Sequence, residues 1–108
     1  MGAELKLQEQ RSQPVVKVVV VGYALDVFDH RVYELPLRQG MTMQDLFIEL
    51  SRHGKSGFRE AIYDPEKGRM NEYLAVFVNS REIRSLNGLS TVLSAGDTVT
   101  ILPPMAGG

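Results

Sequence analysis

The chain has 108 residues, 44% of them apolar, which is enough to build one domain around a single core. With 12 basic and 13 acidic residues the net charge is -1, so the sequence shows no basic surface of the kind that binds nucleic acid. It contains no cysteine, and its apolar runs are shorter than the roughly 18–20 residues of a membrane span. We therefore expect no disulfide, no thiolate chemistry, no nucleic-acid or membrane partner, and a cytoplasmic location.

The first third of the sequence predicts a polar leader followed by two strands. Residues 1–14 lack periodicity and are interpreted as a disordered or vector-derived leader. The β-branched run VVKVVVV at 15–21 predicts a strand that is covered on both faces or held centrally in its sheet. YALDVFDH then predicts a turn, and the alternation over 31–37 predicts a half-buried strand. Pro36 lacks an N–H group and therefore favours the edge of a sheet.

Residues 42–53 carry the clearest helix signal. Thr42 with Asp45 three residues later is close to a capping box, and an acidic residue in the first turn suits the helix dipole. One apolar stripe follows at helical spacing, formed by Met43, Leu46, Phe47 and Leu50. Gly54 predicts the C-terminal stop. We expect this helix to pack one face onto a sheet.

The second half of the chain predicts short elements separated by turns. In chain order these are a helical turn at 58–62, a turn at 64–68, a strand at 73–78, a short strand around Ile83, a turn at 87–88, a tight helical turn at 90–93, a turn at 95–97 and a strand at 98–102. The order is ββαβββ, and the apolar first and last strands are expected side by side and parallel at the centre. This predicts an α+β fold of the β-grasp (ubiquitin-like) type, a mixed sheet packed on one main helix, over residues 15–102.

Side chains that carry chemistry are scarce. His30 and His53 lie far apart in sequence with no third ligand at metal spacing, so no metal site is expected. Asp26, Asp29 and Asp97 occur in turns, where aspartate commonly bonds its own backbone. Because no phosphate-binding glycine loop is present either, we predict no catalytic residue in the chain.

The C-terminal run ILPPMAGG has properties suited to a reactive tail. Pro103 and Pro104 are stiff and extended, and the six residues after Leu102 can span about 20 Å. Gly107 and Gly108 carry no side chains and can thread a narrow channel. The terminal carboxylate, with a pKa of roughly 3.5, is ionised at neutral pH and can attack a nucleotide phosphate to form an acyl-adenylate. The simpler alternative is a frayed end without function.

The sequence from about residue 15 resembles the MoaD/ThiS family of ubiquitin-like sulfur carriers. Its most specific part is FVNSREIRSLNGLSTVLSAGDTVTILPPMAGG, in which the Val-Asn turn at 78–79, the Ala-Gly-Asp turn at 95–97 and the diglycine end match the family. The NGL and ILP stretches are most similar to CysO-type members. The diproline resembles MoaD-type members, although Leu102 replaces their usual Phe. The pathway therefore stays open between the two.

The resemblance implies a carrier rather than an enzyme, although it could count as the small subunit of a molybdopterin-synthase-like complex. An E1-like adenylyltransferase would use ATP and magnesium to adenylate Gly108, and a sulfur donor would convert it to a thiocarboxylate. A sulfur-accepting synthase, either the molybdopterin synthase large subunit or a cysteine synthase, would take the sulfur. The carrier itself binds no cofactor. The threaded tail would comprise Pro103, Pro104, Met105, Ala106 and Gly107 within the flexible segment 103–108.

Three outward positions of the 73–78 strand form a candidate docking patch for a partner: Tyr73, Ala75 and Phe77. Packing against a loop or a neighbouring strand is the other interpretation of these side chains.

Two further functions of the chain stay open. One is a ubiquitin-like modifier conjugated to target lysines through Gly108, and the other is an interaction module with an inert tail.

Overall fold

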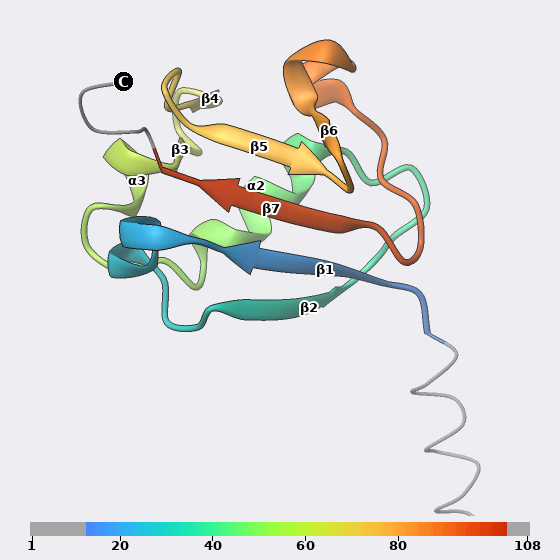
Figure 1. Ribbon diagram of the computed structural model, residues 1–108, viewed down its shortest axis with the longest axis horizontal. Helices are drawn as coiled ribbons and strands as arrows, with labels where there is room; N and C mark the ends of the chain where they lie inside the picture. Colours follow the sequence, from blue (N-terminus) through green and yellow to red (C-terminus); the bar gives the residue numbers. More distant parts are fainter. Residues whose placement is uncertain (1–12, 104–108) are drawn as a thin grey trace, which may run out of the picture.

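A five-stranded mixed sheet lies across a single main helix in the computed structural model, which describes residues 13–103 (Figure 1). The strands are β1 (Val15–Val20), β2 (Val32–Pro36), β5 (Ala75–Val78), β6 (Arg81–Glu82) and β7 (Thr98–Leu102), in the order β2-β1-β7-β5-β6. β1 and β7 run parallel and all other neighbours in this sheet are antiparallel. The predicted parallel pairing of first and last strands at the centre is confirmed.

β1 lies between two neighbours but is covered on one face alone. Val16, Val18 and Val20 are buried, whereas Lys17 is exposed and Val19 half-buried. Of the two predicted alternatives, the structure shows the central position of the strand and not the coverage of both faces. The unbroken β-branched run conceals this alternation, because valine is accepted on either face of a strand. The edge strand β2 is half-buried as predicted, with Tyr33 and Leu35 buried and Val32 and Glu34 exposed, and it ends at Pro36.

The main helix α2 (Met43–Ser51) begins as predicted, with a reciprocal capping box. The backbone N–H of Asp45 donates to Thr42 Oγ1 at 3.2 Å, and the backbone N–H of Thr42 donates to Asp45 Oδ2 at 3.0 Å. These bonds to Thr42 hold the pKa of the Asp45 carboxyl below its ordinary value, because they favour the charged form. The four residues of the predicted apolar stripe are fully buried against the sheet.

Gly54 does not end this helix, contrary to the prediction. α2 ends at Ser51, followed by Arg52 in right-handed helical conformation, and Gly54 forms an isolated bridge with Phe28. A Cβ atom at Gly54 would lie 2.5 Å from Cγ of Phe58, a distance that real Cβ atoms do not tolerate. Glycine is therefore required here to make room for the buried Phe58 ring, and not for a left-handed turn.

Shorter elements fill the loops. The predicted turn after β1 is a 3₁₀ helix, η1 (Gly22–Val27), because Ala24 and Val27 are buried in the core and one helical turn presents both inward. The other short elements are α3 (Phe58–Ala61), β3 (Tyr63–Asp64), β4 (Arg69–Met70), η2 (Ile83–Ser85) and η3 (Gly88–Ser90). The β3–β4 hairpin surrounds the predicted turn at 64–68 and was itself not predicted. Ile83 begins η2 instead of lying in a strand.

Candidate functional site

The candidate site is the end of β7, from which the C-terminal tail leaves the domain (Figure 1). Ile101 is fully buried and lies opposite Val20 on β1 and Val76 on β5. Leu102 is half-buried and lies opposite Ala75. Pairing on both sides therefore fixes Ile101, and pairing with β5 holds Leu102 on one side.

Pro103 is the one tail residue within the described part of the chain, and it packs beside η1. A Cβ atom at Gly22 would lie 3.3 Å from Cγ and 3.5 Å from Cδ of the Pro103 ring. The backbone N–H of Val21 donates to the Ile101 carbonyl oxygen at 3.0 Å, which keeps the start of η1 next to the end of β7. The other predicted site residues, Pro104, Met105, Ala106, Gly107 and Gly108, lie outside the described residues, as does the predicted leader up to residue 12.

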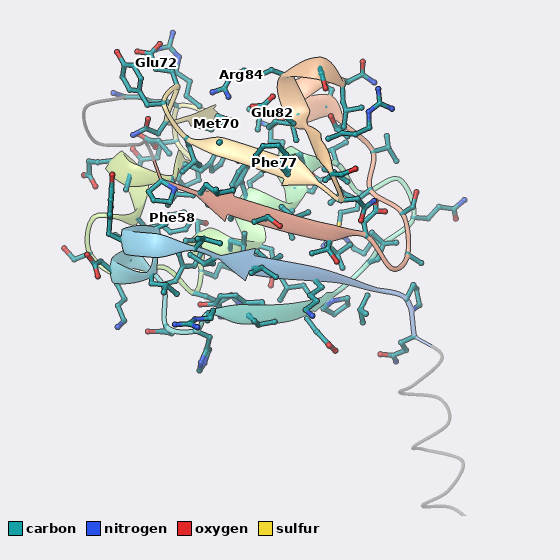
Figure 2. The ribbon with its side chains drawn as sticks, viewed as in Figure 1. Phe58, Met70, Glu72, Phe77, Glu82 and Arg84 are labelled. Carbon is teal, nitrogen blue, oxygen red and sulfur yellow. The ribbon has the colours of Figure 1, made fainter. Side chains whose placement is uncertain are left out.

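Two members of the predicted docking patch lie on the outer face of the sheet, which is the face that does not contact α2. Ala75 and Phe77 are half-buried in β5, and Figure 2 shows Phe77 on the sheet face turned away from the helix. Tyr73 lies in the turn before β5 instead of in the strand, and it is 72% exposed. The residues are therefore accessible to a partner, and Phe77 also packs among its strand neighbours.

On the outer face, a row of neighbouring side chains extends this patch from β5 across β7 and β1 to β2. The strand register places Phe77 beside Thr100, Thr100 beside Val19, and Val19 beside Val32. Val32 is 44% exposed, and the others are half-buried. Sequence reasoning assigned the patch to one strand. Its extension depends on which residues pair across strands, and only the alternation in each strand hinted at it.

Arg84, at the rim of this face, connects η2 to the turn that carries Tyr73. Arg84 Nη1 lies 2.5 Å from Glu82 Oε1, and Nη2 donates to the backbone carbonyl of Glu72 at 2.6 Å (Figure 2). The pair is half-exposed and contributes modestly to stability. The hydrogen bond from Arg84 to Glu72 holds the Tyr73 turn against η2.

The two turns that resemble the family pattern contact each other at the opposite end of β7. Asn79 Nδ2 donates to Asp97 Oδ1 at 3.0 Å, and the Thr98 backbone N–H donates to Asn79 Oδ1 at 3.0 Å. Asp97 also accepts a bond from the Ser94 backbone N–H at 2.8 Å. These contacts hold the start of β7, and pairing with β1 and β5 holds the strand from there to its end.

His30 and His53 both pack against the ring of Tyr33, although they lie far apart in the sequence. The centroid of Tyr33 lies 5.6 Å from that of His30 and 5.7 Å from that of His53. The Tyr33 hydroxyl accepts bonds from the backbone N–H groups of Asp29 and His30. Between residues 13 and 103, no three His, Cys, Asp or Glu side chains gather in a way that would hold a metal ion.

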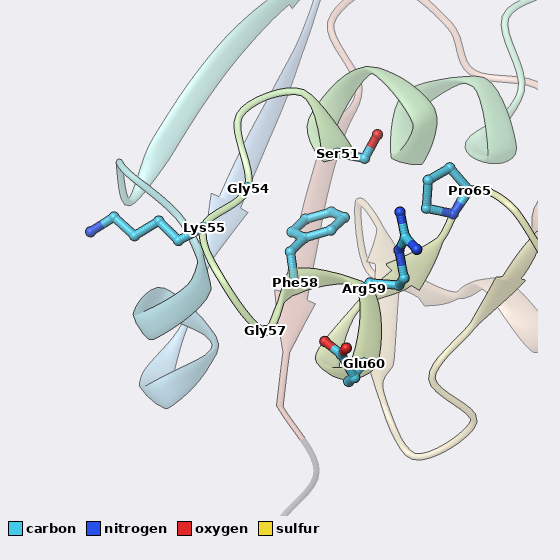
Figure 3. Close-up of a pocket in the computed structure, with 8 residues that line it drawn as sticks. All are labelled: Ser51, Gly54, Lys55, Gly57, Phe58, Arg59, Glu60 and Pro65. Atoms are coloured by element: carbon cyan, nitrogen blue, oxygen red, sulfur yellow. The ribbon is translucent and has the colours of Figure 1, made fainter.

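A polar surface hollow lies between the end of α2 and α3 (Figure 3). Its lining includes Phe58 and Arg59, but the guanidinium of Arg59 already faces Asp64 at 3.7 Å and Glu66 at 3.4 Å. The hollow therefore has no unpaired arginine with which to bind an anion. None of the described helices has the length and apolar character needed to cross a bilayer.

A mixed sheet grasping one helix, with the C-terminal segment leaving its central strand, defines a ubiquitin-like protein. The solved structure of Urm1 from Trypanosoma brucei shares the fold, with a TM-score of 0.73 and 21% identity over 90% of this chain and 98% of that chain. A chain of the Amycolatopsis orientalis BexX/CysO complex gives a TM-score of 0.63 and 27% identity over 86% of this chain and 99% of that one.

The chain belongs to the ThiS family, which matches residues 27–108. Among curated proteins it is similar to the sulfur carrier protein CysO of Mycobacterium tuberculosis, with 41% identity over 54 residues, 49% of this chain and 58% of that protein. It is also similar to small archaeal modifier protein 3 of Haloferax volcanii, with 42% identity over 55 residues, 45% of this chain and 60% of that protein. The matches thus span somewhat over half the length of these relatives. The resemblance to the sulfur-carrier family is confirmed.

Proposed function

We propose that this protein is a sulfur carrier that works through the carboxylate of Gly108. The observation that carries the proposal is the family match over residues 27–108, because it extends through the diglycine end. The relative CysO is itself named a sulfur carrier. The fixed end of β7 supports the same function, since a tail that must enter a partner's active site benefits from a rigid origin.

The chemistry requires two steps at Gly108. Its carboxylate oxygen attacks the α-phosphorus of ATP in the active site of an E1-like adenylyltransferase, forming an acyl-adenylate and releasing pyrophosphate with magnesium bound to the phosphates. Hydrosulfide delivered by a donor then attacks the acyl carbon and expels AMP, which leaves a thiocarboxylate. In this scheme the chain supplies the carboxylate and its position, and the partner supplies the catalytic groups.

The outer sheet face is the proposed docking surface for the adenylyltransferase. Tyr73, Ala75 and Phe77 offer an aromatic and apolar surface of the kind enriched at interfaces. They lie next to the end of β7, since Ala75 pairs with Leu102. A partner bound there receives the tail directly, because the segment 103–108 spans about 20 Å when extended. We place this exchange in the cytoplasm.

For the sulfur acceptor we propose a cysteine synthase, supported by the 41% identity to CysO. A molybdopterin synthase large subunit is the alternative, supported by the fold neighbour named putative molybdopterin converting factor subunit 1 from Pyrococcus furiosus, at 25% identity and a TM-score of 0.64. Purified thiocarboxylate offered to each synthase decides between them. Sulfur transfer to an activated serine supports the first acceptor, and transfer to a pterin precursor supports the second.

A modifier function is the second candidate, favoured by the 42% identity to small archaeal modifier protein 3. The same acyl-adenylate serves both functions, because a lysine amine can attack its acyl carbon as sulfide does. The product is then an isopeptide bond from Gly108 to another protein. Intact-mass and peptide mass spectrometry on protein purified from its host separate the two.

The test compares the full chain with a Gly108 deletion. The carrier predicts a species heavier by the difference between sulfur and oxygen. The modifier predicts lysines of other proteins that carry residues 85–108 after trypsin digestion, because no Lys or Arg follows Arg84 in this chain. Deletion of Gly108 should remove either product and leave the melting temperature unchanged. If neither product forms with a competent adenylyltransferase, both functions are wrong. Equal product from the deletion variant would also refute the assignment to Gly108.

A further inference from the structure

Gly22 lies at the point where the tail leaves the sheet, although 80 residues lie between it and Pro103 in the sequence. It is the first residue of η1 and has a left-handed backbone, with φ of +66°. A Cβ atom there would lie 3.3 Å from Pro103 Cγ, which is closer than nine in ten real Cβ contacts. The backbone of η1 therefore approaches the first tail residue more closely than most residues with a side chain would allow.

Pro103 has little freedom to move away from such a contact. Its ring is closed onto its own backbone nitrogen, so it cannot rotate about χ1 as an open side chain does. The chain before it is held on both sides, since Val21 bonds the Ile101 carbonyl at 3.0 Å and Leu102 pairs with Ala75 on β5. An added atom that contacts the ring can be accommodated in part by a change of ring pucker. Any further displacement must therefore change the direction in which the backbone continues after Pro103.

We propose that Gly22 is a positioning residue for the C-terminal tail. Its missing side chain lets the Pro103 ring rest against η1, and this contact sets the direction in which the chain leaves β7. The inference rests on the proposed function, in which Gly108 must reach the adenylating site of a partner docked on the outer sheet face. Gly22 takes no part in the chemistry and acts through Pro103.

Two properties of Gly22 must be separated, namely its positive φ and the space it leaves. Asparagine tolerates the left-handed region better than other residues with a side chain, so Gly22→Asn keeps the backbone and adds the Cβ contact. Gly40→Asn is the matched control. Gly40 also has a left-handed φ, of +78°, is exposed, and has no atom within 4 Å of the position a Cβ would take. Its loop between β2 and α2 lies at the other end of the sheet (Figure 1).

The first measurement is pyrophosphate release by the adenylating enzyme of the same organism, with ATP and each full-length variant. Because a misplacement of about 1 Å can cost 10²-fold in rate, we expect Gly22→Asn to lower kcat about tenfold while KM stays within about twofold. Gly40→Asn should match the wild type. Pro103→Ala removes Cγ and Cδ, so adding it to Gly22→Asn should restore kcat to the level of Pro103→Ala alone. Equal kcat for Gly22→Asn and Gly40→Asn, or no rescue, overturns the inference.

The second measurement does not depend on activity. Since the sequence contains no cysteine, Met105→Cys accepts one spin label in the tail, and paramagnetic broadening of backbone amides reports where the tail points. Gly22→Asn should change the set of broadened amides, and Gly40→Asn should not. An unchanged pattern refutes the positioning role. If wild-type protein releases no more pyrophosphate than the Gly108 deletion, the proposed function fails, and the spin-label comparison still decides whether Gly22 directs the tail.

Discussion

Replacing Asn79 tests whether the contact between the two family-like turns holds β5 and β7 in register. Asn79 has a φ of +57°, and among residues 13–103 it is the one residue other than glycine with a positive φ. Its side chain makes two hydrogen bonds, to Asp97 Oδ1 and from the Thr98 backbone N–H, both at 3.0 Å. Asn79→Gly removes both bonds and keeps the backbone relaxed, whereas Asn79→Ala removes both and strains it.

The expected magnitudes follow from these two losses. Each bond at this exposed site contributes about 0.5–1 kcal/mol, so Asn79→Gly should lower the free energy of unfolding by about 1–2 kcal/mol. The left-handed backbone costs alanine more than glycine by roughly 0.5–1 kcal/mol once the larger unfolded-chain entropy of glycine is counted. Asn79→Ala should therefore lose about 1.5–3 kcal/mol, which lowers the melting temperature by about 10 °C for a domain of this size.

Urea denaturation followed by circular dichroism measures these differences, with Asp97→Ala and the double variant completing a cycle. We expect a coupling free energy of about 0.5–1 kcal/mol between Asn79 and Asp97, because they share one hydrogen bond. Losses additive within about 0.3 kcal/mol would show that the contact does not contribute. An Asn79→Ala variant as stable as Asn79→Gly would contradict the argument from backbone strain.

Three further outcomes are expected. Gly54→Ala should lower the free energy of unfolding by about 1–3 kcal/mol, since its methyl group overlaps the Phe58 ring, and a thermal melt equal to wild type would contradict this. Asp45→Asn should destabilise the protein at pH 7. The penalty should be smaller at pH 2.5 than at pH 7, because stability from a lowered pKa is present above the ordinary value of 3.8 and is lost as the pH falls through the folded pKa. Urea titrations at the two pH values measure the penalty, and a penalty that does not depend on pH refutes the argument. Tyr73→Ser should raise KM for adenylation and leave the melting temperature unchanged, because the side chain is 72% exposed; an unchanged KM argues against docking there.

The parts of the fold that the sequence predicted correctly are governed by local signals. The capping box of Thr42 and Asp45 and the apolar stripe of α2 involve residues at most seven positions apart, so their pattern is visible along the chain. The edge strand is marked by Pro36, whose missing N–H group acts wherever the strand lies. The central pair of strands was found because both are apolar and β-branched.

The parts that sequence reasoning missed depend on contacts between distant residues or on very short elements. Gly54 after a helix has the pattern of a C-cap, and only the position of the Phe58 ring shows its different role. β3 and β4 have two residues each, too few to show an alternation. The outer row through Val19, Thr100 and Phe77 depends on strand register, which no single strand encodes.

At the candidate site, sequence reasoning predicted the outer-face residues but not the contacts of Pro103. Ala75 and Phe77, which we propose as docking residues, lie on the outer face as the alternation in the sequence predicted, whereas the contact between Gly22 and Pro103 had no signal in the sequence. The chemistry assigned to Gly108 came from composition at the chain end and from family resemblance. It remains a prediction for the mass measurements described above.

The parallel pairing of β1 with β7 also determines when a newly synthesised chain can fold. β7 fills the middle of the sheet, so until residues 98–102 have left the ribosome, β1 and β5 have no common neighbour and the core valines of β1 stay uncovered on that side. Such long-range pairing is formed late and slowly. A chain that stalls or is cut before β7 therefore lacks the folded outer face that we propose as the docking surface.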